Sequence, residues 1–263
     1  MQKLHFYELL KNMIDLLSIV KYCDERLRIR EIKDFPGAFN GLQIDKVGKV
    51  SKVGAAVDAG FVPFEKATEK KIDFLVVHHG IFWSPPTPLT GVNFNKVKHC
   101  MDHDLAVYSA HLPLDCHDEL GNNAIIAKRL NLKPCGGFLN FEGHDIGLLT
   151  QSQFSREELK SQLLNEFSQG IQSIEFGSAN PPKIAILSGS GQSAVEQILN
   201  FGCDTLITGE LKQQHFNYAQ ENGLNLYVCG HYATETFGVQ ALAEEIAQRF
   251  DLPYEFISTE CSL

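Results

Sequence analysis

The sequence predicts an α/β protein made of two related, interlocked α/β domains with mixed sheets flanked by helices. Short apolar runs alternate with helical stretches over most of the chain, as they do in βαβ units. The alternation occurs twice, on either side of a segment of different character at 135–182. Because domains usually hold about 100–200 residues, a chain of 263 residues suits one large or two interlocked domains. We expect one domain to comprise 1–132 and 224–263, and the other 133–223.

The first half of the chain predicts a helix followed by strands and further helices. Apolar and charged residues alternate at helical spacing over 4–30, and the turn signal Phe35-Pro36-Gly37 follows. The later elements are a β-rich run ending at Gly60, a helical stretch at 64–71, a strand ending at His78-His79-Gly80, a strand at 105–111 and a helix at 121–130.

The second half repeats this rhythm after the segment 135–182. Ser155 stands three residues before Glu158, which predicts a helix that opens with a capping box. The later elements are an apolar run at 183–191, a helix reaching Asn200, strands at 204–210 and 224–231 with a helix between them, and a last helix to about Phe250.

Composition, charge and cysteine usage exclude several classes of protein. Hydrophobic residues make up 44% of the chain and charged residues 21%, an ordinary mix for a globular protein. A net charge of −9, from 23 Lys+Arg and 32 Asp+Glu, makes direct binding to nucleic acid or to an anionic membrane surface unexpected. No run approaches the roughly 20 apolar residues of a membrane-spanning helix. Seven scattered Cys without a CxxC pair argue against a disulfide framework and fit the reducing cytoplasm, where we expect the protein.

An internal repeat supports two related halves. Residues 53–79 align without a gap onto 184–210, an offset of 131, and His78-His79 then falls at the same strand end as Glu210.

A second match lies further along each half, at an offset of 120. His111-x3-Asp115 aligns with His231-x3-Glu235, and each pair follows an apolar strand. Each half therefore offers a histidine and a carboxylate just beyond a strand.

These positions matter because ligand sites in α/β sheets collect at the carboxyl ends of strands. Imidazole and carboxylate together suit Zn, Fe, Mn, Co or Ni better than Ca or Mg alone. Such a set is large enough for a two-metal site, whose ions lie about 3.5–4 Å apart. The candidate ligands are His78, His79, His111, Asp115, His231 and Glu235.

Each candidate also has a structural interpretation when it is taken alone. A buried histidine is commonly a hydrogen-bonded core residue, His78-His79 suits a solvated turn, and Asp115 suits a helix cap. In a regular strand His78 and His79 would point to opposite faces, so a shared pocket requires the strand to end there. The metal interpretation therefore depends on the set and not on any one member.

The motifs around these residues resemble the Nif-three-like family, whose bacterial members carry the name GTP cyclohydrolase I type 2 homologue. The resemblance runs from about residue 39 to 242 and is closest to the short form that lacks a central inserted domain. The motifs are FNGLQI at 39–44, FLVVHHGIFW at 74–83, YSAHLPLDCHDELGNNA at 108–124, GSG at 189–191, LITGELKQQHF at 206–216 and GHYATETFGVQAL at 230–242.

The resemblance implies a two-domain protomer of a toroidal homohexamer, a trimer of dimers, with a dinuclear metal centre facing the inner cavity. It assigns the metal ligands to His78, His79, Asp115, His231 and Glu235 and makes Glu235 the expected bridge. His111 is then a further ligand, a residue that orients a ligand, or a proton shuttle. Near Asp115 the chain departs from the commoner H-T-N-L-D pattern by carrying Pro113, which leaves the ligands intact.

We expect two divalent metal ions per chain and a metal-dependent hydrolase that acts on a nucleotide or related heterocycle, GTP among the possibilities. His111 and Glu210 are the candidate acid–base residues, although Glu210 equally suits a structural carboxylate. A non-enzymatic metal-binding ring, acting as a scaffold or regulatory interaction protein, is the alternative. A metal store or sensor is the third possibility, and nothing in the sequence identifies the residues that bind substrate.

Two further features receive structural interpretations. Ser188-Gly189-Ser190-Gly191 lies between a strand and a helix, where an anion could bind, but it is not a full phosphate-binding motif and a plain turn is expected. His215 is expected on a helix surface.

Overall fold

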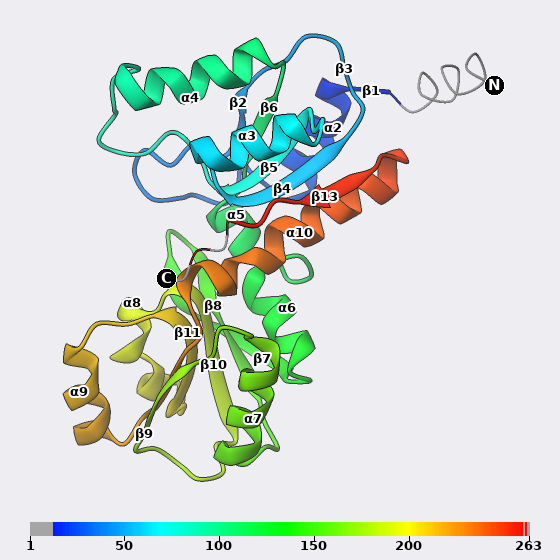
Figure 1. The fold of residues 1–263 in the computed structure, drawn as a ribbon. Helices are drawn as coiled ribbons and strands as arrows, with labels where there is room; N and C mark the ends of the chain where they lie inside the picture. Colours follow the sequence, from blue (N-terminus) through cyan, green and yellow to red (C-terminus); the bar gives the residue numbers. More distant parts are fainter. Residues whose placement is uncertain (1–12, 260, 262–263) are drawn as a thin grey trace. The chain divides into compact units, whose positions relative to one another are not determined.

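The computed structural model describes residues 13–259 and 261 and divides the chain into two compact units (Figure 1). The first unit comprises the chain up to Leu114 together with Val239–Thr259, and the second comprises Asp115–Gly238. The chain passes between the units within two helices, α5 (Leu112–Asp115) and α10 (His231–Phe250). The first unit is therefore assembled from two separate stretches of the described chain.

The first unit contains a five-stranded mixed sheet in the order β13-β4-β5-β6-β2. Its parallel strands are β4 (Val53–Asp58), β5 (Phe74–His79), β6 (Ala106–Ser109) and β13 (Tyr254–Phe256), and β2 (Gly41–Ile44) is antiparallel. A separate antiparallel pair consists of β1 (Ile14–Asp15) and β3 (Lys49–Val50).

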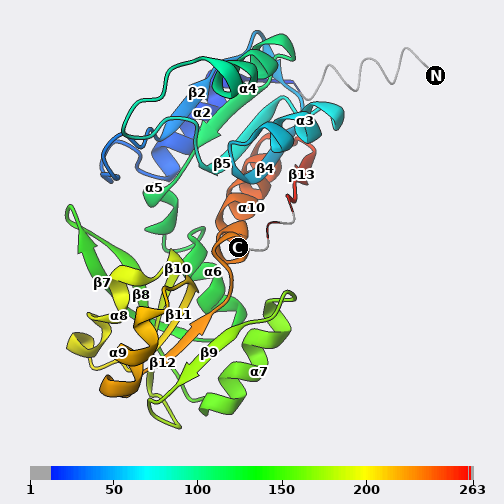
Figure 2. The ribbon, with the colours of Figure 1, turned by 60° about the vertical axis from the view of Figure 1, so that its left-hand side comes forward.

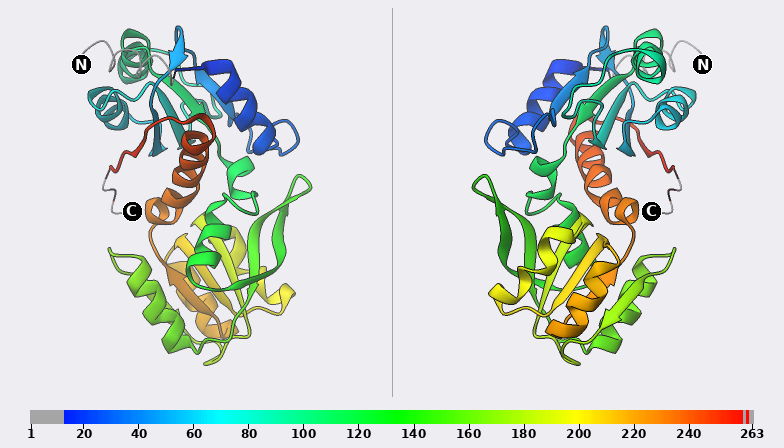
Figure 3. Two further views of the ribbon diagram at one scale, coloured as in Figure 1. Left: turned by 90° about the vertical axis from the view of Figure 1, so that its right-hand side faces the viewer. Right: turned by 90° about the vertical axis from the view of Figure 1, so that its left-hand side faces the viewer.

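Helices cover both faces of this sheet, which explains why its strands read as unbroken apolar runs. Figure 3 shows α2 on one side and α3 and α4 on the other. Phe64 of α3 and Val97 of α4 pack with Leu75 of β5, whereas the Tyr108 hydroxyl donates to Asp24 of α2 at 2.9 Å. The helices are α2 (Leu16–Arg26), α3 (Phe61–Glu69) and α4 (Gly91–Asp102).

The second unit contains a six-stranded mixed sheet in the order β7-β8-β10-β11-β12-β9. Its parallel strands are β10 (Lys183–Ser190), β11 (Thr205–Glu210) and β12 (Asn225–Val228). The antiparallel strands are β7 (Lys133–Phe141), β8 (His144–Gln151) and β9 (Gln172–Glu175).

Alternate residues of β10 point to opposite faces of this sheet, and each face has its own core. Ile184 and Ile186 pack with α6 and α7, and Ala185 and Leu187 pack with α8 and its neighbours. Figures 1 and 2 show the two groups of helices on opposite sides of β10 and β11. The helices are α6 (Asn122–Arg129), α7 (Arg156–Glu166), α8 (Gln192–Val195), the 3-10 helix η1 (Ile198–Phe201) and α9 (Gln214–Asn222).

The domain boundaries differ from those expected, because 115–132 and 224–238 belong to the second unit. Ile126 of α6 shares a core cluster with Leu159 of α7 and Ile184 of β10. β12 is hydrogen-bonded to both β11 and β9, so it lies inside the second sheet. Packing and strand pairing thus place these segments, although they adjoin the first unit in sequence.

Individual elements agree with the sequence in most places. Ser155 and Glu158 form the capping box at the start of α7, and α10 ends at Phe250. The helix expected to reach Asn200 is instead the single turn α8 followed by η1. The helix expected over 4–30 is shorter than predicted: α2 covers Leu16–Arg26, Ile14–Asp15 form strand β1, and 27–30 form a turn. Residues 1–12 lie outside the described range.

The internal repeat reappears in the register of the strands. Gly54 pairs with Leu75, and Ala185 pairs with Leu206, which are the positions 131 residues later. The order β4-β5-β6 with an antiparallel neighbour therefore corresponds to β10-β11-β12 with β9.

Among the residues that the structure describes, no helix has both the length and the apolar character needed to cross a bilayer.

Candidate metal centre

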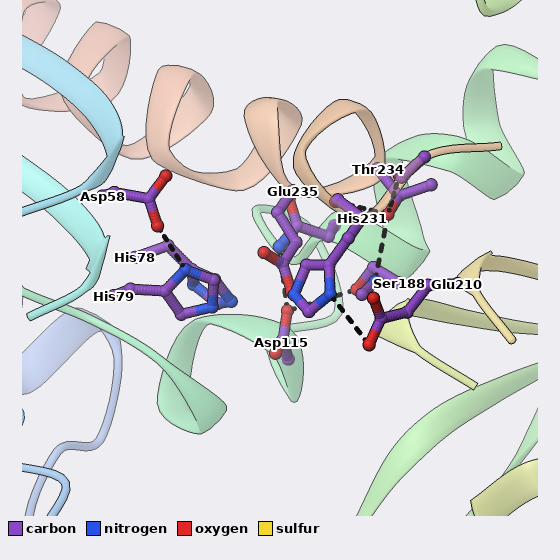
Figure 4. Close-up of polar contacts among 12 residues, drawn as sticks. Asp58, His78, His79, Asp115, Ser188, Glu210, His231, Thr234 and Glu235 are labelled. Carbon is purple, nitrogen blue, oxygen red and sulfur yellow. Dashed lines mark hydrogen bonds and ion pairs between the residues drawn. The ribbon is translucent and has the colours of Figure 1, made fainter. Parts of the chain in front are cut away.

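Three histidines meet at the carboxyl ends of neighbouring strands in the first unit. His78 and His79 end β5, and His111 follows β6. One ring nitrogen from each of the three lies within 4.8 Å of the others, close enough for one metal ion to bind all three (Figure 4 draws His78 and His79). The rings of His78 and His79 lie 4.9 Å apart although the residues are adjacent. The two adjacent rings are thus on the same side at the end of β5, which is the arrangement that a shared pocket requires.

The Nδ1 atom of each ring is engaged by an oxygen atom. His78 Nδ1 lies 2.9 Å from the Ala110 carbonyl, and His79 Nδ1 lies 2.8 Å from Asp58 Oδ1. His111 Nδ1 lies 2.9 Å from Asp34 Oδ1. Because a carbonyl or carboxylate oxygen accepts, each Nδ1 donates a proton and each Nε2 carries the lone pair that a metal needs.

Asp34 is the centre of a small network that fixes His111. Its carboxylate accepts from the Leu112 N–H at 3.0 Å and from Asn40 Nδ2 at 2.8 Å. Asn40 Oδ1 in turn accepts from the His111 N–H at 2.7 Å. Burial alone raises the pKa of Asp34, but the hydrogen bond and electrostatic attraction of the His111 ring, with hydrogen bonds from Asn40 and the Phe35 N–H, outweigh burial and lower the pKa. The carboxylate therefore stays ionised beside the imidazole.

Sequence reasoning missed Asp34 and Asp58. Asp34 is 77 residues from His111 in the chain and lies in a loop that shows no periodic pattern. The available signal was the FNGLQI motif, which contains Asn40 and marks the loop without revealing what it contacts.

The second unit carries a separate group of donors, contributed by α5, β11 and α10. His231 lies between two carboxylates, with Nε2 at 3.2 Å from Glu235 Oε1 and Nδ1 at 3.5 Å from Glu210 Oε1 (Figure 4). His231 and Glu235 are four residues apart on α10, so both project from one face of the helix. Asp115 Oδ1 accepts from Asn122 Nδ2 at 2.9 Å.

The electrostatics of this group favour a cation. The hydrogen bond to Glu235 is the main reason that the pKa of His231 is raised to about 9. Burial opposes this shift, and the negative charges of Glu235 and Glu210 add to it. Without a metal, His231 is therefore protonated at neutral pH, and a divalent cation would replace that proton among the same carboxylates.

The glycine-rich segment at the end of β10 allows the start of α10 to approach the sheet. A Cβ atom on Gly189 would lie 2.2 Å from Glu235 Oε1, and φ there is +63°. The Gly189 N–H donates to Thr234 Oγ1 at 3.0 Å. The helix that follows, α8, is only four residues long and offers no anion site. This segment thus leaves space for the Glu235 carboxylate and has a structural role.

The predicted site residues therefore fall into two groups. His78, His79 and His111 meet in the first unit. In the second unit Asp115 ends α5, Glu210 ends β11, and His231 and Glu235 lie in the first turns of α10. Donors of this kind, imidazoles with buried carboxylates, fit a transition metal.

His215 differs from expectation because it is buried. Its Nδ1 accepts from the Lys212 N–H at 3.0 Å, so it stabilises the turn before α9.

Comparisons with known proteins agree with this architecture. A family model described as Duf34/NIF3 (NGG1p interacting factor 3) matches residues 14–262. A relative from Deinococcus radiodurans, named GTP cyclohydrolase 1 type 2 homolog, is 37% identical over 250 residues, covering 92% of each chain. A relative of the same name from Borreliella burgdorferi is 38% identical over 225 residues, covering 85% of this chain and 90% of its own.

A solved structure shows the same fold. The protein TTHA1606 from Thermus thermophilus matches with a TM-score of 0.82 and 35% identity, covering 95% of this chain and 100% of its own. These matches confirm the resemblance that the motifs suggested, and the chain belongs to the DUF34/NIF3 family.

Proposed function

We propose that this protein is a metal-dependent hydrolase with a dinuclear centre and that its substrate is a nucleotide or related heterocycle. The observation that carries the proposal is the gathering of histidine and carboxylate donors at equivalent strand ends in both units. The names of the relatives from Deinococcus radiodurans and Borreliella burgdorferi point to the same class of substrate for those proteins.

In this proposal the centre is held by the residues that the motif resemblance assigns, together with His111. A single helical turn, α5, separates His111 from Asp115 along the chain, and the rise per helical residue is about 1.5 Å. The ligands would be His78, His79, His111, Asp115, His231 and Glu235, with Glu235 as the bridge. The Nδ1 acceptors of the three first-unit histidines favour His111 as a ligand over a proton shuttle.

When bound, a divalent metal would supply Lewis acidity and would lower the pKa of a water ligand to about 7. The chain's own residues orient the ligands and move protons. Glu210 lies on the Nδ1 side of His231, opposite Glu235, and is partly exposed, so it is placed to exchange a proton with a bound molecule. For a purine nucleotide, the reaction would be hydrolytic opening of the imidazole ring at C8.

The first test is metal content per chain, measured by elemental analysis on protein purified without chelators. We expect about two transition-metal ions per chain in the wild type, and a loss of both in the combined variant His78→Ala/Glu235→Ala. His103→Ala removes the exposed histidine that follows α4 and serves as the matched control, because the metal content of this variant should equal that of the wild type.

The second test is turnover of GTP and related nucleotides by the metal-loaded protein. Glu235→Ala should abolish hydrolysis that the wild type performs. Equal rates in both would contradict the proposal, and metal binding without turnover of any nucleotide would favour the scaffold alternative. The homohexamer stays a prediction, which sedimentation velocity of the wild-type protein tests.

A further inference from the structure

Two loops of the first unit place aromatic side chains beside the three histidines. Trp83 approaches His111 edge-on, with ring centres 5.1 Å apart and an interplanar angle of 82°. It also lies 6.1 Å from His79, and Phe35 lies 5.9 Å from His111. We call the side chains of Phe35 and Trp83 the aromatic lip.

One ring of the lip and two other rings of the same loops are exposed to solvent. Phe35 is 40% exposed, Phe39 is 54% exposed and Phe82 is 39% exposed. Leaving aromatic rings in water forgoes the free energy that their burial would supply, so exposed rings beside polar donors are suited to bind a ligand.

Specific contacts hold the two loops in place. Gln43 Oε1 accepts from the Ile81 N–H at 2.7 Å, and Gln43 Nε2 donates to the Phe39 carbonyl at 2.6 Å. Trp83 Nε1 donates to the Gly80 carbonyl at 2.9 Å. A Cβ on Gly80 would lie 2.2 Å from Gln43 Nε2, so only glycine lets Gln43 reach both loops. This assigns a role to the FNGLQI motif, which otherwise has none beyond Asn40.

The chemistry of the lip selects a ring and not a phosphate. Residues 34–40 and 80–85 contain no Lys or Arg. Aromatic faces attract any flat π-system, so stacking recognises a ring whatever its substituents. These two segments offer a phosphate no cationic side chain of their own.

We propose that the aromatic lip binds the planar heterocyclic ring of the substrate by stacking, beside the histidine cluster. This proposal rests on the proposed function, since it specifies the substrate class of the same site. It makes Trp83 and Phe35 specificity-determining residues that recognise the ring, with Gln43 as a positioning residue.

Trp83 is the only tryptophan in the chain, so its fluorescence reports on the lip directly. Guanosine, which has the ring without phosphate, and tripolyphosphate, which has phosphate without the ring, are the two probes. Guanosine should quench Trp83 saturably in protein of measured metal content, and tripolyphosphate should leave the emission unchanged. Quenching by tripolyphosphate alone, or by neither probe, would overturn the proposal.

Variants separate stacking from folding. Equilibrium dialysis should show that Trp83→Ala and Phe35→Ala bind guanosine on the order of tenfold more weakly, whereas Trp83→Phe retains most of the affinity. Phe94→Ala, which removes an exposed ring on α4, should bind like the wild type. Unchanged guanosine affinity in Trp83→Ala and Phe35→Ala would overturn the proposal.

The same samples distinguish this inference from the proposed function. Metal content near two ions per chain without guanosine binding would remove the lip proposal and leave the metal centre standing. Guanosine binding that depends on Trp83 in a protein without metal would support the lip and remove the hydrolase.

Discussion

At the scale of single residues, the site depends on the atoms that hold each ligand in position. The three histidines of the first unit have different Nδ1 acceptors: a backbone carbonyl, Asp58 and Asp34. An acceptor at Nδ1 fixes both the tautomer and the ring orientation, and a carboxylate also increases the basicity of the ligand. Asp34 is thus as much a part of the site as the histidine that it contacts.

Asp34→Asn should weaken metal binding because it removes the negative charge next to His111. We expect affinity about 10–100-fold lower, the usual consequence of losing such a partner. Competition with a chromogenic chelator measures this. Asp73→Asn is the control, since Asp73 accepts from the Ser51 and Lys52 N–H groups away from the histidines. Equal losses in both variants would show that Asp34 serves folding and not the metal.

Gly189→Ala should destabilise the protein and lower its metal content. The new Cβ would overlap the Glu235 carboxylate. Alanine would also be held in a left-handed backbone conformation, at φ +63°. Gly170→Ala isolates the backbone effect, because Gly170 has φ +86° with no atom within 4 Å of the new Cβ. Urea unfolding should show Gly189→Ala to be roughly 1–3 kcal/mol less stable than Gly170→Ala. Similar stabilities would mean that Glu235 moves aside without cost.

At the scale of elements, the two halves share a register but differ at the strand ends. Tyr108 of β6 corresponds to Tyr227 of β12, because Tyr108 pairs with Val76 and Tyr227 pairs with Ile207. That correspondence is an offset of 119, one less than the offset relating His111 to His231. The extra residue lies before His231, next to Gly230 with φ +96°. The strands of the two halves therefore correspond in register, whereas the lengths of the short connections after them determine the positions of the candidate ligands.

Strand β13 closes one edge of the first sheet and carries an ion-pair cluster. Glu255 lies between Lys52 and Lys70, and hydrogen bonds from Lys52 and then Lys70, together with their positive charges, lower its pKa from 4.5 to about 2. A lowered folded-state pKa stabilises the protein above the unfolded value and does so less as the pH falls toward the folded value.

Glu255→Gln should therefore destabilise the protein at neutral pH and matter less in acid. In urea unfolding, the difference in the free energy of unfolding between the variant and the wild type should be largest well above pH 4.5 and should narrow as the pH falls toward 2. Glu31→Gln, which removes a single exposed ion pair with Arg28, is the control and should show the smaller gap. A gap that stays constant with pH would rule out the ion pairs as its cause.

At the scale of the whole molecule, the chain crosses between its units inside helices. α5 and α10 each begin in one unit and end in the other, and donors lie at both crossings. If the proposed ligands share one metal centre, metal binding must couple the unfolding of the segments that carry them. A ligand that binds only the folded protein stabilises it by about 2.7 kcal/mol at a concentration 100 times its Kd.

A double-mutant cycle on metal-dependent stability tests this coupling. The rise in melting temperature on adding metal is measured by calorimetry for the wild type, His79→Gln, Glu235→Gln and the double variant. A shared centre predicts strong non-additivity, because either single change removes most of the effect. Additive losses would indicate two independent sites, one in each unit.

Much of the fold follows from patterns that are local in sequence. The runs ending at His79 and Glu210 are strands because their apolar side chains are buried on both faces, and the capping box at Ser155 depends on four consecutive residues. The repeat then placed His111 and His231 beyond equivalent strands. Such features need only neighbouring residues to be specified.

The sequence by itself thus determined the α/β class, the interlocked order of two related halves, the family and the histidines that could bind metal. Tertiary structure alone decided the domain boundaries: α6 belongs to the second unit because its apolar face is buried there, and β12 because it is hydrogen-bonded to strands of that unit. It also decided which carboxylates orient the histidines, because Asp34 and His111 are brought together across 77 residues. The physical reason is that local pattern fixes each element's conformation, whereas the partner of a polar side chain depends on how distant elements pack.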